Sequence, residues 1–69
     1  MKAILIETEY IDLSQALKLV GLVGTGGEAK YFLQENTIKV NSALENRRGR
    51  KLYPGDILQI NKEEYKITK

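Results

Sequence analysis

Cysteine and histidine are both absent from the 69-residue sequence. Without cysteine the chain can form neither a disulfide framework nor a thiolate metal site, and a reducing compartment suits it best. The remaining potential ligands have no metal-binding spacing, so we expect no metal and no cofactor. The nine carboxylates are scattered, as surface charges and helix caps usually are. We therefore expect a protein that is not an enzyme.

Long apolar runs are also missing. The first ten residues, MKAILIETEY, contain one lysine and an apolar run too short for a signal peptide. No segment approaches the roughly 18 apolar residues of a membrane span. These absences predict a cytoplasmic protein with no membrane partner.

The length allows one small domain, residues 1–69, because a chain of this size buries only about 60% of its unfolded surface. A deep enclosed site, and with it a small-molecule substrate, is not expected. Hydrophobic residues make up 42% of the sequence and occur along its whole length, which is enough for a core.

Positive charge is concentrated in one segment although the net charge of the chain is only +2. Residues 39–51 contain five basic residues and one acidic residue, a local charge of +4, which leaves −2 for the rest. A segregated basic segment is typical of a surface that docks a polyanion. A solvated hairpin would have the same charge pattern, so charge alone leaves both interpretations open.

Two short helices are expected in the first half of the chain. Asp12 and Gln15 have the spacing of a capping box before a helix over Leu13–Val20, which Gly21 can end in a left-handed conformation. Thr25 and Glu28 form a second such pattern and start a helix that we expect to end at Asn36 with a left-handed backbone. The two helices make an αα-hairpin.

Alternating or short apolar segments predict strands around these helices. The first, Lys2–Ile6, is expected inside a small sheet and could pair with the last, which contains Tyr65 and Ile67. The other predicted strands and turns are Ile38–Val40, a tight turn at Asn41-Ser42, a return at Leu44, a loop or exposed edge over Asn46–Lys51, a type II turn at Pro54-Gly55, a strand over Ile57–Ile60 and a polar turn over Asn61–Glu64.

Gly24, Gly26 and Ala29 satisfy the dinucleotide-binding pattern G-x-G-x-x-A, but the context argues against it. That fingerprint follows a parallel strand within a βαβ unit of about 30 residues, whereas here a helix precedes it. No G-K-[ST] phosphate loop is present either. The simpler interpretation is that these glycines let the chain turn and the helices approach each other.

The sequence from Leu13 to Leu58 resembles the small RNA-binding domain named for ribosomal protein S4. The residues that carry the resemblance are an L-x-x-x-L helix followed by glycine, a second helix with E-A-K, an I-x-V-N strand and a closing K-L-x-P-G-D-I. The G-G-E-A-K, V-N and E-x-R-R-G-R-K-L-x-P-G-D segments are most similar to stand-alone bacterial members called YaaA.

The resemblance implies an α+β fold, an αα-hairpin packed on a small, mostly antiparallel sheet, which is the S4-like or αL motif. It also implies that the helical face and the adjoining hairpin bind structured RNA. The candidate RNA-binding residues, which could share one face, are Lys18, Lys30, Lys39, Asn41, Arg47, Arg48, Arg50 and Lys51. Tyr31 could add a stacking or phosphate-contacting group, or be a partly buried rim aromatic.

One departure from the family concerns the start of the second helix. Many members carry arginines where this chain has Gly26 and Gly27. Long side chains cannot contact RNA at these positions, but the free backbone amides of a helix N-terminus can hold a phosphate.

Taken together, the residues and the resemblance predict a non-catalytic protein that binds structured RNA, with ribosomal RNA or an assembling ribosomal particle as the implied partner. The alternative is a protein-interaction module whose basic face docks an acidic partner. A ubiquitin-like sulfur carrier is discounted, because such carriers end in Gly-Gly and this chain ends in Ile-Thr-Lys.

Overall fold

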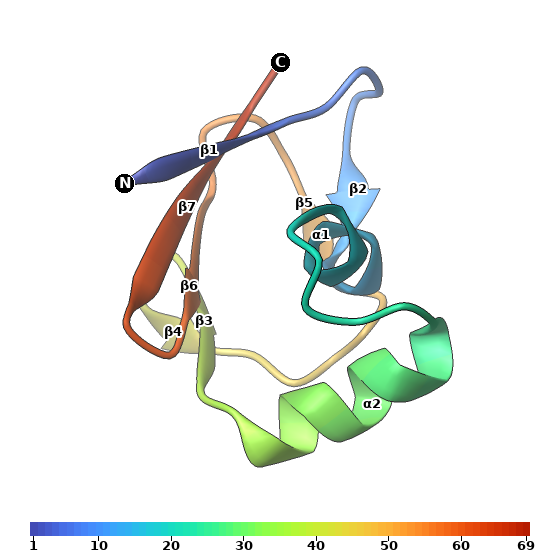
Figure 1. Ribbon diagram of the computed structural model, residues 1–69. Coiled ribbons are helices and arrows are strands. Elements are labelled where there is room, and N and C mark those ends of the chain that lie inside the picture. The colour runs from blue at the N-terminus through green and yellow to red at the C-terminus, as the bar shows by residue number, and fades with distance from the viewer.

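Five of the seven strands form one sheet in the computed structural model, which describes residues 1–69, and both helices lie on one side of that sheet (Figure 1). Its strands are β1 (Lys2–Leu5), β7 (Glu63–Thr68), β6 (Ile57–Ile60), β3 (Ile38–Val40) and β4 (Ala43–Leu44), in that spatial order. The helices are α1 (Leu13–Leu19) and α2 (Gly26–Glu35). The predicted α+β class, an αα-hairpin on a small sheet, is confirmed.

The predicted pairing of the first and last strands is confirmed, and it is parallel, with Lys2 opposite Tyr65. All other pairs are antiparallel, so the sheet is mostly antiparallel as expected. The expected position of β1 inside the sheet was wrong, because β1 is an edge strand that pairs only with β7. Ile4 and Ile6 are buried, while Leu5 points to solvent.

A second, two-stranded sheet was not predicted. Its strands are β2 (Ile11–Asp12) and β5 (Lys51–Leu52), which pair antiparallel with Ile11 opposite Leu52. Two residues are too short to carry a hydrophobic period, so only the tertiary contact reveals these strands. Ile11 and Leu52 point into the core. We call this sheet the β2–β5 ribbon; it joins the start of α1 to the chain that follows the arginines.

The capping box at α1 is complete. The Gln15 amide donates to the Asp12 carboxylate at 2.8 Å, and the Asp12 amide donates to the Gln15 side-chain oxygen at 3.0 Å. Leu13, Ala16 and Leu17 are buried, which matches the predicted inner face. Gly21 follows the helix with a φ of +79°, the left-handed conformation expected there.

The helix α2 begins as predicted and ends differently. Thr25 accepts a hydrogen bond from the Glu28 amide at 3.1 Å, but the return bond of a capping box is not formed. The left-handed end predicted at Asn36 was wrong, because this residue is extended, with a φ of −130°. Its side-chain amide instead donates to the Phe32 carbonyl and accepts from Asn61, so two side-chain bonds replace the left-handed turn.

The predicted turns lie close to their expected positions. Asn41 and Ser42 both have positive φ, and Gly55 has a φ of +97° in a turn closed by a hydrogen bond from the Asp56 amide to the Tyr53 carbonyl. The turn between β6 and β7 is shorter than predicted, because Glu63 and Glu64 already pair with β6.

One hydrophobic core of 16 buried residues lies between the helices, the five-stranded sheet and the β2–β5 ribbon. Phe32 and Val20 pack against its rim. Neither helix has the length and apolar character needed to cross a membrane.

Candidate nucleic-acid interface

Glu45, the single acidic residue of the basic segment, is buried beneath it. Its carboxylate accepts hydrogen bonds from the backbone amides of Asn46 and Arg47, at 3.2 and 3.1 Å. It also accepts two bonds from the Arg47 guanidinium, at 2.9 and 3.0 Å, and one from Arg50 at 2.7 Å. We call residues 45–50 the basic loop; the carboxylate fixes its shape from below.

The two arginines keep Glu45 ionised. Hydrogen bonding from the Arg47 side chain, aided by Arg50, lowers the pKa of Glu45 from 4.5 to about 2, although burial acts in the opposite direction. The same contact raises the pKa of Arg47. The Arg47 side chain is 72% exposed, so its guanidinium still faces solvent while one edge is held by Glu45.

Backbone hydrogen bonds tie the basic loop to α1. The Leu13 amide donates to the Arg50 carbonyl at 2.9 Å, and the Ser14 amide donates to the Arg48 carbonyl at 3.1 Å. These are amides of the first helical turn, which no carbonyl of the helix can reach. Carbonyl groups of the loop therefore accept hydrogen bonds from the free amides at the N-terminus of α1, and the same bonds hold the loop against the helix.

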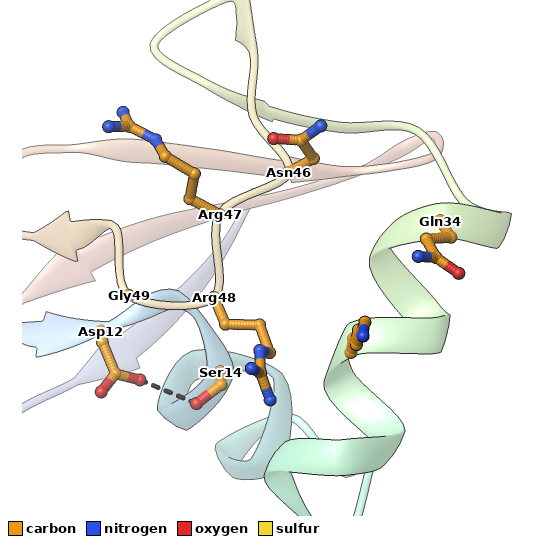
Figure 2. A pocket seen from close by; sticks show the side chains of 8 residues that line it. Asp12, Ser14, Gln34, Asn46, Arg47, Arg48 and Gly49 are labelled. Atoms are coloured by element: carbon orange, nitrogen blue, oxygen red, sulfur yellow. Dashed lines mark hydrogen bonds between the residues drawn. The ribbon is translucent and has the colours of Figure 1, made fainter.

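Arg48 connects the same loop to α2. Its Nη1 donates to the Gly26 carbonyl at 3.1 Å, in the first turn of that helix. Figure 2 shows Arg48 extending toward α2, whereas Arg47 extends to the other side of the loop. The two adjacent arginines thus present positive charge on two different sides of the loop.

An open groove lies between the start of α1, the outer face of α2 and the basic loop (Figure 2). Its lining contains no hydrophobic residue and consists of Asp12, Ser14, Lys30, Gln34, Asn46, Arg47, Arg48 and Gly49. Three of these residues are basic and one is acidic, but the Arg47 guanidinium extends to the other side of the loop and bonds to Glu45, so Lys30 and Arg48 supply most of the positive charge of the groove. One oxygen of the anion, Oδ1 of Asp12, accepts hydrogen bonds from the Ser14 hydroxyl at 2.9 Å and from the Gln15 amide at 2.8 Å. Cationic residues outnumber anionic ones in the groove.

The structure brings together only part of the predicted site. Lys30, Arg47 and Arg48 line the groove, and Gly26 touches Arg48 at its end. Arg50 and Lys51 line a second hollow beyond the loop. These six residues lie in the basic loop or directly beside it.

The other predicted residues lie elsewhere. Lys18 lines a separate hollow between α1 and β1, and Lys39 is half-buried on β3. Both ends of the Asn41 amide are used within the fold, by Asp56 and by the Ile57 backbone amide. Tyr31 is exposed on α2, and Gly26 and Gly27 form its first turn.

Sequence reasoning missed Glu45, which it grouped with the scattered carboxylates. The available signal was a lone acid at the start of an arginine-rich segment, E-x-R-R-G-R. Ser14, Gln34 and Asn46 also line the groove without having been predicted. No group of three or more histidine, cysteine, aspartate or glutamate side chains could hold a metal ion.

Comparisons with known proteins agree with this architecture. A family model described as an S4 domain matches residues 4–68. The chain is also similar to a protein of Bacillus subtilis (strain 168) described as a probable ribosome maturation protein, RlbA. The two are 53% identical over 55 residues, which cover 80% of this chain and 78% of that relative.

Proposed function

This chain belongs to the S4 domain family, and from that membership we propose that it is a non-catalytic protein that binds structured RNA during ribosome maturation. The description of the Bacillus subtilis relative as a ribosome maturation protein supports the process. Ribosomal RNA, alone or in an assembling subunit, is the partner, and the cytoplasm is the compartment in which they meet.

The observation that carries this proposal is the polar, cationic groove between α1, α2 and the basic loop. Lys30 and Arg48 approach it from opposite walls, and no hydrophobic side chain lines it. Such a surface suits phosphate oxygens, which contact charged donors in RNA complexes and position the RNA without reading its sequence. The planar guanidinium of Arg48 can hold a phosphate with two parallel bonds.

The amides of Gly26 and Gly27 add donors beside Arg48, at the end of the same groove. Arg47 lines the groove as well, and Arg50, Lys51 and Tyr31 extend the interface around it. Lys18, Lys39 and Asn41 lie outside the groove, and we assign the two lysines to the general positive potential. Three carboxylates near the site, those of Asp12, Glu45 and Asp56, accept hydrogen bonds within the fold, which argues for binding rather than catalysis.

The test compares the salt dependence of RNA binding between two double variants of equal charge. Lys30→Ala with Arg48→Ala removes both walls of the groove, and Lys62→Ala with Lys66→Ala removes two exposed lysines from outside it. Arg47 and Arg50 are left intact, because removing them would strand the buried Glu45 charge.

We expect the groove variant to bind a ribosomal RNA hairpin more weakly and to reduce the logarithmic salt slope by about 1.4 to 1.8, since each phosphate contact contributes about 0.7 to 0.9. The control should keep the parent slope. Fluorescence anisotropy over a series of potassium chloride concentrations measures both. Equal slopes for the two double variants would place the RNA contact elsewhere.

A second experiment separates this proposal from a protein-interaction module. The tagged chain is recovered from bacterial lysate with and without ribonuclease treatment. We expect ribosomal RNA to be enriched in the untreated sample and the associated proteins to be lost after digestion. Proteins that persist after digestion, without RNA enrichment, would favour the module with an acidic partner.

A further inference from the structure

Two exposed tyrosines, Tyr10 and Tyr53, lie side by side directly beyond one end of the β2–β5 ribbon. Ile11 of β2 lies opposite Leu52 of β5, and both point into the core. Side chains alternate between the two faces of a strand, so the neighbours Tyr10 and Tyr53 point outward. Their ring centroids are 5.6 Å apart and the rings are tilted by 45°.

These two rings contribute little to the core of the domain. They are 42% and 47% exposed, and neither belongs to the buried cluster. Neither hydroxyl donates a side-chain hydrogen bond within the fold, so both keep their hydrogen-bonding capacity as well as aromatic surface. A small domain therefore exposes an aromatic pair that its own packing does not require.

Cationic groups lie directly beside the pair. The Lys51 ammonium is 5.0 Å from the centroid of the Tyr10 ring. Tyr53 lines a hollow together with Arg47, Gly49, Arg50, Lys51 and Asp56. Both oxygens of Asp56 accept bonds inside the fold, from the Tyr53 amide and the Asn41 side chain. The aromatic surface is thus continuous with the basic loop.

We propose that Tyr10 and Tyr53 form a stacking platform for an unpaired RNA base, with Lys51 and Arg50 beside the phosphate of that nucleotide. The inference rests on the proposed RNA-binding function and narrows its substrate class to a helix that is interrupted or flanked by unpaired nucleotides. Aromatic side chains on a sheet surface next to cations are how proteins bind splayed-out bases. The helical part of the RNA lies in the groove on the other side of the basic loop.

The test uses the full chain and two RNA hairpins that differ in one feature. One has a single bulged 2-aminopurine, whose fluorescence falls when it stacks, and the other is fully paired. We expect the chain to bind the bulged hairpin more tightly and to quench its fluorescence. Tyr53→Leu should weaken binding to the bulged hairpin about tenfold, a typical value for losing one stacked base, and leave the paired hairpin unchanged.

Tyr53→Phe is the matched control, because it keeps the ring and removes only the hydroxyl; it should retain the quenching and the preference. Thermal unfolding by circular dichroism checks that each variant is folded. The quenching by the unchanged protein is a readout that requires no variant at all.

The outcomes separate this inference from the function on which it rests. If both hairpins bind equally and the 2-aminopurine signal does not change, the stacking platform is overturned while RNA binding stands. An equal loss for both hairpins in Tyr53→Leu has the same consequence. If neither hairpin binds, the proposed function and the stacking platform are overturned together.

Discussion

At the scale of single residues, burial of the Glu45 carboxylate is unfavourable unless strong donors replace its water. Five donated hydrogen bonds do so, three of them from guanidinium groups. A buried ion pair can contribute little net stability, but removing one partner lowers the free energy of unfolding strongly, because the other charge is left buried without a partner. Glu45 therefore couples the stability of the domain to the shape of its most basic segment.

This coupling predicts a loss of stability in acid. The pKa of Glu45 is lower in the folded chain, about 2, than the ordinary value of 4.5 that applies to the unfolded chain. Its contribution to the free energy of unfolding is therefore complete above about pH 4.5 and is lost as the pH falls toward 2. The loss is at most about 3 to 4 kcal/mol. Urea unfolding followed by circular dichroism across this pH range measures it.

The Glu45→Gln variant should lose most of the pH dependence of the free energy of unfolding between pH 4.5 and 2. It should also be less stable than the parent at neutral pH. Glu64→Gln is the matched control, because Glu64 is exposed on β7 and makes no ion pair. It should keep the stability and pH dependence of the parent. A Glu45→Gln protein as acid-sensitive as the parent would mean that another group causes the effect.

At the scale of elements, α1 depends on groups outside its own seven residues. Asp12 caps one amide, and carbonyls of the basic loop accept two more. A helix this short is not stable in isolation, so these bonds and the buried face of Leu13, Ala16 and Leu17 decide whether it forms.

The cap predicts different results for two substitutions that remove the same charge. Asp12→Ala loses the acceptor for the Gln15 amide and should lower the free energy of unfolding by about 1 kcal/mol, within a range of 0.5 to 2. Asp12→Asn keeps a side-chain oxygen in place and should cost much less. Urea unfolding at neutral pH measures both. If the two variants lose equal stability, the charge rather than the cap is responsible.

Elements with a local signal could be predicted from the sequence. Both helices, their starting caps, the turn at Pro54-Gly55 and the strand over Ile57–Ile60 depend on residues within a few positions of one another. The β2–β5 ribbon could not be predicted, because its strands are two residues long and about 40 positions apart. The end of α2 was predicted wrongly, because Asn36 bonds to Asn61, a residue distant in sequence.

At the scale of the whole molecule, the core is small and each buried side chain is a large part of it. A domain of this size has a free energy of unfolding of roughly 3 to 10 kcal/mol. The edge strand β1 contributes one buried isoleucine, Ile4, and the residue that directly follows the strand, Ile6, is buried as well. Both side chains belong to the hydrophobic core.

Adjacent residues of β1 should therefore respond in opposite ways to truncation. Ile4 is 4% exposed, and Ile4→Ala should lower the free energy of unfolding by about 2 to 5 kcal/mol. Leu5 is 69% exposed, and Leu5→Ala should change it by no more than about 0.5 kcal/mol. Thermal and urea unfolding check both values. Similar losses for the two variants would mean that β1 does not sit at this register.

The candidate site was predictable in composition but not in arrangement. The cluster of arginines and the resemblance to S4 domains pointed to the basic loop, which the structure places between the two helices. Which lysines join it depends on how α1, α2 and β3 pack. Lys30 of α2 faces the loop, while Lys18 and Lys39 do not line the groove. The periodicity of a helix or strand shows which of its residues share a face, but not which other element lies beside that face.

The two backbone hydrogen bonds between the basic loop and α1 also limit which sequence changes the loop can accept during evolution. Loop side chains that do not bond to Glu45, such as those of Asn46 and Arg48, can be exchanged while the loop backbone still caps the helix. An inserted or deleted residue between Arg47 and Lys51 would instead move the Arg48 and Arg50 carbonyls away from the amides of Ser14 and Leu13. We therefore expect the length of this loop to vary less among related chains than the side chains that do not bond to Glu45.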